Sequence, residues 1–134
     1  MSLAGAVTAL VNAVSTAIGA PAKYSALPAN APVRTPAVMG RWVATKPSQL
    51  SMTKHVMREH EVTLYVVLGA ARDMPNEDTA ALSTAQSVLD AVDATNLSGA
   101  VQRCDVTNIA PDLLQWGDAT FYAVAAACSL IEGR

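Results

Sequence analysis

The chain has 134 residues, a length typical of one domain with a single hydrophobic core. Its formal net charge of -2 argues against a protein that grips nucleic acid, because such binding depends on Lys and Arg neutralising phosphates. Only 15% of the residues are charged, 51% are hydrophobic and much of the apolar content is Ala and Val, so a monomer would be poorly solvated and modestly stabilised. This composition favours an oligomer.

The first segment has the spacing of an amphipathic helix. Ser2 is placed to cap it and Gly19 to end it. The segment lacks the basic start and uninterrupted apolar run of a signal peptide, and it is too short and too polar to span a membrane. Its apolar stripe consists of Leu3, Val7, Leu10, Val11, Val14 and Ile18.

A proline-rich arm follows, from Ala20 to Pro36 (20–36), and its four prolines exclude a helix. An extended arm of this length suits reaching across a neighbouring subunit, and a plain surface connection is the alternative. Residues 37–44, AVMGRWVA, then predict a first strand that ends at Lys46-Pro47-Ser48.

Four potential metal ligands, His55, Glu59, His60 and Glu61, precede an apolar run. From His60 onward the apolar residues alternate with a period of two, which predicts a strand. On a strand, Glu59 and Glu61 point away from His60, so the four side chains do not converge on one ion. We therefore expect a polar strand entrance and no metal or other cofactor.

A second helix is expected after Asn76, the predicted cap, with Glu77 and Asp78 favourably placed in its positive first turn. It should end among residues 95–99, which supply turn chemistry. The predicted buried stripe is Ala81, Leu82, Ala85, Val88, Leu89 and Val92.

The last third predicts two strands with a turn between Pro111 and Asp118. The Ala-rich run 123–127 could be helical, but Phe121 and Tyr122 before it favour a strand. With a turn centred near Trp116, Cys104 and Cys128 come roughly opposite one another. No zinc-binding spacing surrounds these two cysteines, and reduced, partly buried thiols are expected.

The predicted fold is a single α+β domain, residues 1–134, with a mostly antiparallel sheet of about four strands and two flanking helices in the order α-β-β-α-β-β. Five segments mark this order: VNAVSTAIGA, PAVMGRWVA, REHEVTLYVV, DTAALSTAQSVLDAVDA and ATFYAVAAACSLI. In these segments and their order, nearly the whole chain resembles the tail-terminator (tail-completion) proteins of long-tailed phages.

The resemblance implies a structural virion protein without catalytic activity. Such a protein forms a homo-oligomeric ring, typically a hexamer, that caps the tail tube and ends its polymerisation. The expected partners are the tail tube protein and the head-closure or connector protein. DNA passes through the central channel without specific binding, and no membrane is involved. The expected location is the tail or neck of a virion assembled in the host cytoplasm.

Two sets of residues are candidates for these contacts. Aromatic and Arg side chains are enriched as interface anchors, which selects Tyr24, Arg34, Arg41, Trp42 and Arg72. For Tyr24 and Trp42, ordinary core packing is the alternative. Acidic groups that line a channel would repel DNA phosphates, which selects Asp73, Glu77 and Asp78.

Three other functions stay open at this stage. A head-closure or stopper ring would have a similar composition and similar partners. An enzyme would need a nucleophile with its base or a set of metal ligands, and the sequence contains no readable motif of either kind. A small-ligand binder predicts a closed monomer with an apolar pocket.

Overall fold

The computed structural model describes residues 3–20, 22–24, 36–48, 57–70, 77–94 and 103–132. Within them lie two helices and five strands, which confirms the α+β class. Their bounds are α1 Leu3–Ile18, β1 Ala22–Tyr24, β2 Ala37–Ser48, β3 Met57–Ala70, α2 Glu77–Ala94, β4 Arg103–Trp116 and β5 Ala119–Glu132.

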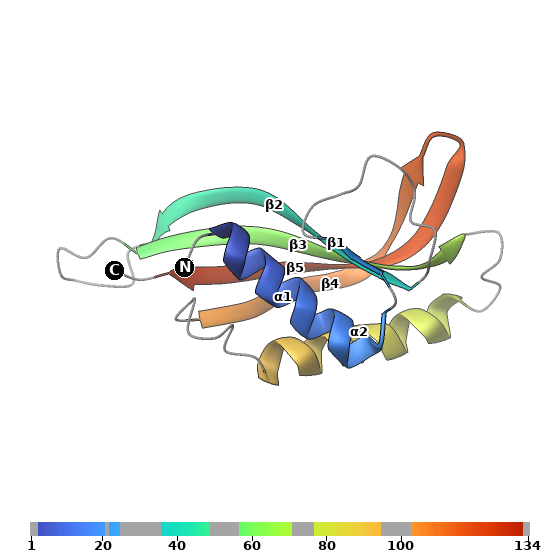
Figure 1. The fold of residues 1–134 in the computed structure, drawn as a ribbon, viewed down its shortest axis with the longest axis horizontal. Coiled ribbons are helices and arrows are strands. Elements are labelled where there is room, and N and C mark those ends of the chain that lie inside the picture. The colour runs from blue at the N-terminus through green and yellow to red at the C-terminus, as the bar shows by residue number, and fades with distance from the viewer. Residues whose placement is uncertain are drawn as a thin grey trace.

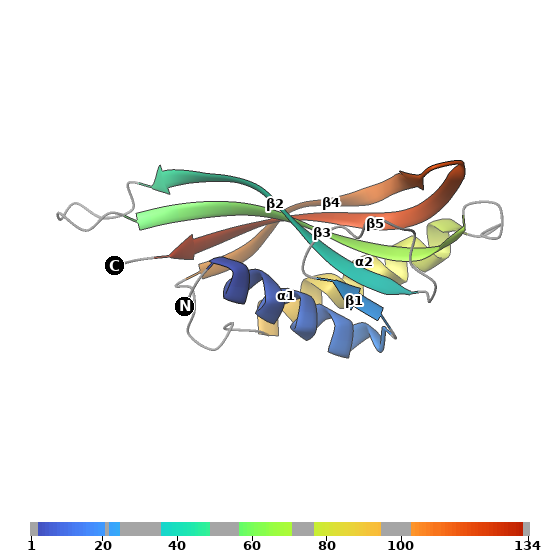
Figure 2. The same ribbon diagram turned by 45° about the horizontal axis from the view of Figure 1, so that its top comes forward.

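The five strands form one sheet in the order β1-β2-β3-β5-β4. All neighbours are antiparallel except β1, which runs parallel to β2. Both helices lie on the same face of the sheet (Figure 1), and the long strands twist strongly along their length (Figure 2).

Strand β1 was not predicted, because it lies within the segment expected to be a proline-rich arm. Ala22–Tyr24 contains no proline, so each of its residues keeps a backbone donor and can pair with Ala37–Met39 of β2. The expected four strands are therefore five, and the order of the other elements is as predicted.

Helix α1 packs its apolar side into the core and ends before Gly19, as the sequence predicts. Leu10 and Val14 are fully buried, and Gly19 has a φ of 73° that suits a left-handed helix end. The backbone N–H groups of Gly19 and Ala20 donate to the carbonyl of Ser15 at 2.9 and 3.0 Å. Ser15 itself is buried, and its hydroxyl lies 3.5 Å from the Ala20 carbonyl. The predicted cap, Ser2, lies outside the described residues.

Helix α2 packs beside α1 through Val88 and Val92, which are buried as predicted. Leu82 was predicted to be buried but is 74% exposed. The helix lies over β4 and β5 at the border of the sheet, and an open groove separates Leu82 from these strands. Periodicity identifies the apolar face of a helix, but it does not show whether the sheet covers the whole of that face. The predicted cap, Asn76, lies outside the described residues.

Strand β3 is the centre of the sheet and shows the predicted alternation. Val62, Leu64 and Val66 belong to the main core between the sheet and the helices. Tyr65 and Val67 belong to a second cluster on the opposite face. Both predicted faces of this strand are therefore confirmed.

The second cluster forms around buried Met39 and Val67 at one end of the sheet. Large side chains from several strands pack against it, including Tyr24 and Tyr65. Trp116 and Phe121 also belong to it, in a T-shaped pair with ring centroids 5.5 Å apart and an interplanar angle of 82°.

Two strands continue through prolines that were expected to interrupt them. Strand β2 runs through Pro47 to Ser48, and β4 runs through Pro111 to Trp116. Strand β4 is at the border of the sheet, and β1 pairs with β2 only at Ala37–Met39. Proline is tolerated at a sheet border because the missing donor costs no hydrogen bond on the outer side.

Strands β4 and β5 form a hairpin whose turn, Gly117 and Asp118, falls at the end of the predicted range. Gly117 has a φ of 60°, a conformation that costs glycine little. The Ala-rich run lies in β5, which confirms the strand. Because the turn is not centred on Trp116, Cys104 pairs with Leu130 and Cys128 with Val106, so the cysteines are diagonal rather than opposite.

We expect Leu64→Ala to lower the free energy of unfolding by about 2–5 kcal/mol, because Leu64 is fully buried in the central strand and its loss leaves a cavity. The matched control is Leu82→Ala, the same substitution at an exposed position, for which a change within about 0.5 kcal/mol is expected. Urea denaturation of both variants measures this difference. Equal losses would contradict the assigned core.

Candidate assembly interface

The described residues contain four exposed large hydrophobic side chains, and they lie at two separate borders of the molecule. Trp42 and Val43 are 55% and 53% exposed on β2. Leu82 of α2 and Leu113 of β4 are 74% and 58% exposed near the other border. Grouped exposed apolar residues mark interaction sites more often than isolated ones do.

The first border, which we call the β2 border, is the outer side of β2 from Gly40 to Ser48, where β1 no longer pairs with it. Val43 is a bulge, since the pairing with β3 shifts between Trp42 and Ala44. The Trp42 indole N–H donates to Thr45 Oγ1 at 2.9 Å, and that oxygen lies 2.8 Å from Nδ1 of His60.

Trp42 projects toward the helix-bearing side of the sheet. It pairs with Val62, and directly paired residues of antiparallel strands carry their side chains on the same face. Val62 belongs to the core beneath the helices. Arg41 pairs with Thr63 and therefore projects to the opposite side, where it is exposed.

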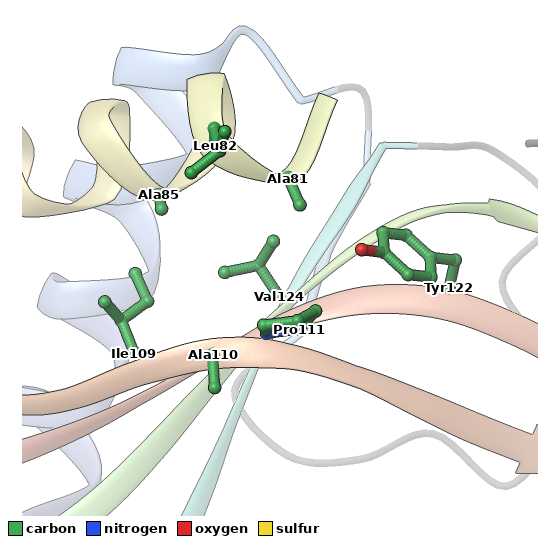
Figure 3. Close-up of a pocket in the computed structure, with 8 residues that line it drawn as sticks. All are labelled: Ala81, Leu82, Ala85, Ile109, Ala110, Pro111, Tyr122 and Val124. Atoms are coloured by element: carbon green, nitrogen blue, oxygen red, sulfur yellow. The ribbon is translucent and has the colours of Figure 1, made fainter. Parts of the chain in front are cut away.

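The second border, which we call the β4 border, contains an open apolar groove of about 410 Å³ on the helix-bearing side (Figure 3). Leu82 of α2 lies at one rim of the groove, and the hydroxyl of Tyr122 from β5 points into the groove. The walls come from α2, β4 and β5 and include Ala81, Leu82, Ile109, Pro111, Tyr122 and Val124. The groove is open because small alanines face it from α2.

The two borders carry opposite charge. Within Gly40–Ser48, β2 contains the basic residues Arg41 and Lys46 and no acidic residue. Lys46 is ion-paired with Glu59 and Glu61 of β3, so Arg41 is the positive charge that this border offers to a neighbour. Strand β4 and its turn contain three acidic residues, Asp105, Asp112 and Asp118, against Arg103. Complementary charge favours contact between unlike borders and opposes contact between like ones.

A polar cluster occupies the sheet face opposite the helices. Lys46 Nζ lies 3.5 Å from Glu59 Oε2 and 3.2 Å from Glu61 Oε1, and the Ser129 hydroxyl donates to Glu59 Oε1 at 2.7 Å. The hydrogen bond from Ser129, together with Lys46, lowers the pKa of Glu59. Hydrogen bonding to Glu61, with the charges of both carboxylates, raises the pKa of Lys46. The cluster borders a depression of about 260 Å³.

The orientation of the His and Glu residues follows the strand prediction. His60 is 4% exposed on the helix-bearing side, and Glu59 and Glu61 meet Lys46 on the other. His55 lies outside the described residues. Within the described part of the chain, no group of three or more His, Cys, Asp or Glu is placed to hold a metal ion.

Both cysteines are free thiols on the core side of the hairpin. Burial raises the pKa of the Cys104 thiol to about 11, with the charges of Asp105 and Asp93 adding to the effect. Burial also raises the pKa of Cys128 to about 12, with Cys104 contributing. Such thiols are poor nucleophiles at neutral pH.

The predicted interface residues divide between the described and undescribed parts of the chain. Arg41 and Trp42 are exposed at the β2 border, and Tyr24 is half-buried against the second cluster. Glu77 and Asp78 open α2, but their side chains are not described. Arg34, Arg72 and Asp73 lie outside the described residues.

The groove and the exposure of Leu82 and Leu113 were not predicted from the sequence. Leu82 fits the apolar stripe of α2, so its exposure cannot be read from periodicity. Leu113 follows a proline in a segment that was interpreted as a turn. A proline tolerated within a strand was the signal for a sheet border here.

The fold is thus an α+β sandwich of one twisted sheet and one helix layer. No protein-family model and no curated protein matches the chain. A chain of a solved structure described as the virion of a native gene transfer agent (GTA) particle is similar, with a TM-score of 0.44 and 16% identity over 98% of this chain and 96% of that one.

Neither described helix has the length and apolar character needed to cross a bilayer.

We expect Glu59→Gln to reduce the pH dependence of stability. Because folding lowers the pKa of Glu59, its carboxylate stabilises the folded state at pH values above 4.5, the ordinary pKa of the group. This contribution is lost as the pH falls through the lower pKa that Glu59 has in the folded state. The wild-type protein should therefore lose more stability than the variant on acidification below 4.5.

Urea denaturation at a series of pH values measures the effect. Ser129→Ala, which removes the largest cause of the lowered pKa, should also weaken the acid dependence. Identical pH profiles for the wild type and Glu59→Gln would contradict this role of the polar cluster.

Proposed function

We propose that the chain is a tail-terminator-like structural protein of a phage-type virion. It forms a ring that caps the tail tube, ends its polymerisation and joins the tail to the head connector, with a central channel for DNA. Its action is assembly rather than catalysis. The observation that carries the proposal is the pair of unlike borders, each with exposed apolar side chains and with charge of opposite sign.

Two unlike borders on one molecule favour a heterologous, head-to-tail contact. Such a contact uses a different patch on each partner and generates a closed ring when the rotation closes. An isologous dimer would bring like charges together, which is unfavourable. The low charged fraction of the chain, 15%, also fits a subunit whose borders are covered in an assembly.

The order of elements supports the family assignment within the proposal. The structure contains the predicted α-β-β-α-β-β order with the short β1 added. In a tail-terminator ring, Arg41 and Trp42 would lie between subunits, with Tyr24, Arg34 and Arg72 as further contacts. Asp73, Glu77 and Asp78 would face the channel, where their charge repels passing phosphates.

We expect the purified chain to form a ring, with six subunits as the expected number, either alone or on the end of a tail tube. Native mass spectrometry over a range of concentrations measures the subunit number. Mixing the chain with the tail tube protein of the same particle tests the activity, because a terminator shortens tubes and caps one end, as electron microscopy shows. Tubes of unchanged length without an end density would contradict the proposal.

The apolar groove favours a second candidate, a binder of small apolar ligands. Its volume of about 410 Å³ falls within the usual range for such sites. A monomer that binds a fluorescent fatty acid at micromolar concentration, and loses this binding in Val124→Trp, would favour this candidate. A ring that excludes the probe favours the terminator.

A further inference from the structure

We propose that Trp42 of one subunit inserts into the groove between α2 and β4 of the next, with Arg41 facing Asp112 on the other side of the sheet. The contact joins the β2 border of one copy to the β4 border of its neighbour. The inference rests on the proposed ring and specifies its subunit contact.

Strand directions define the geometry of this contact. Strands β2 and β5 run in the same direction, and β4 runs opposite to both, because each successive pair from β2 to β4 is antiparallel. A neighbour that continues the sheet with its helices on the same side therefore places its β2 antiparallel to β4.

One register between β2 of one copy and β4 of the next gives a favourable contact on each face of the sheet. Arg41 pairs with Thr63 and Asp112 pairs with Ala123, which place both charged side chains on the face opposite the helices. In an antiparallel register that sets Arg41 beside Asp112, the next residue, Trp42, falls beside Pro111, a wall of the groove. Trp42 projects to the helix-bearing side, where the groove opens.

Size and polarity also match. The groove volume of about 410 Å³ can accept an indole, and its walls are almost entirely apolar. Trp is among the commonest anchors at protein interfaces, where it fills a pocket that excludes water. A 55% exposed Trp42 and a 74% exposed Leu82 would cover one another in this arrangement.

The contact is made by side chains rather than by an extended backbone ladder. The β2 border has a bulge at Val43 and a proline at Pro47, and the β4 border has a bulge at Thr107 and a proline at Pro111. Bulges and prolines interrupt continuous pairing between sheet edges. Specificity therefore comes from the anchor and the charges.

A charge-reversal experiment tests the pairing. Arg41→Glu and Asp112→Arg should each raise the dissociation constant between subunits about tenfold or more, because each variant places like charges across the contact. A mixture of the two single variants should restore assembly, since the introduced glutamate of one variant then faces the introduced arginine of the other while the second type of contact stays wild-type. The matched control is Arg58→Glu, which reverses an exposed Arg on β3, a strand that lies between β2 and β5 rather than at the edge of the sheet, and should leave assembly unchanged.

Trp42→Ala should weaken assembly to a similar extent, with circular dichroism confirming that each variant remains folded. Native mass spectrometry of the wild type, the variants and the mixture reads out all of these results. Rings that persist in both single variants and in Trp42→Ala would overturn the contact but leave the proposed function standing. The wild type could instead form open chains or dimers. If the single variants disrupt these assemblies and the mixture restores them, the result would support the contact and contradict the ring. A wild type that stays monomeric even with tail tubes would overturn both.

Discussion

The arrangement of the molecule depends on the pairing of β3 with a strand on each side and its burial on both faces. Its residues must therefore alternate between two apolar sets, Val62, Leu64 and Val66 under the helices and Tyr65 and Val67 on the opposite side. A slip of one residue would exchange the two sets, so the register is strongly specified. Because β2 pairs directly with β3, the same register decides which border side chains point toward the helix layer and which point away.

The shortage of large side chains evident in the composition has a local counterpart in the groove. Alanines of α2 face strands β4 and β5, and the space between them stays open. Packing at native density would require a bulky residue at this point, and the chain presents its exposed tryptophan at the opposite border. The protomer thus has unfilled volume at one border and surplus apolar surface at the other. In the assembly of identical copies proposed above, the apolar surface of one copy would fill the open volume of the next.

The sequence predicted both helices and the alternation of β3 from periodicity, and the strand character of β5 from the aromatic residues Phe121 and Tyr122 at its start. The fold class follows from these elements. It failed where tertiary context decides. Pro47 and Pro111 suggest breaks, yet both lie in strands at sheet borders, where proline is tolerated because an outward-facing N–H makes no hydrogen bond within the sheet. Strand β1 is too short to show a period. Leu82 fits the apolar stripe of α2, but no local pattern reveals that strands β4 and β5 do not cover this position. The candidate site shares this limit: Arg41 and Trp42 were selected by residue type, whereas the groove exists only in three dimensions.

The two thiols have a consequence for the chemical durability of the protein. Oxidation by peroxide and exchange with disulfides both proceed through the thiolate. With pKa values of about 11 and 12, Cys104 and Cys128 carry almost no thiolate near neutral pH. Their position on the core side of the hairpin also restricts access by reagents. A chain made in a reducing medium and later exposed to air would therefore keep its thiols, and the subunit contact proposed above would not depend on the redox state of its surroundings.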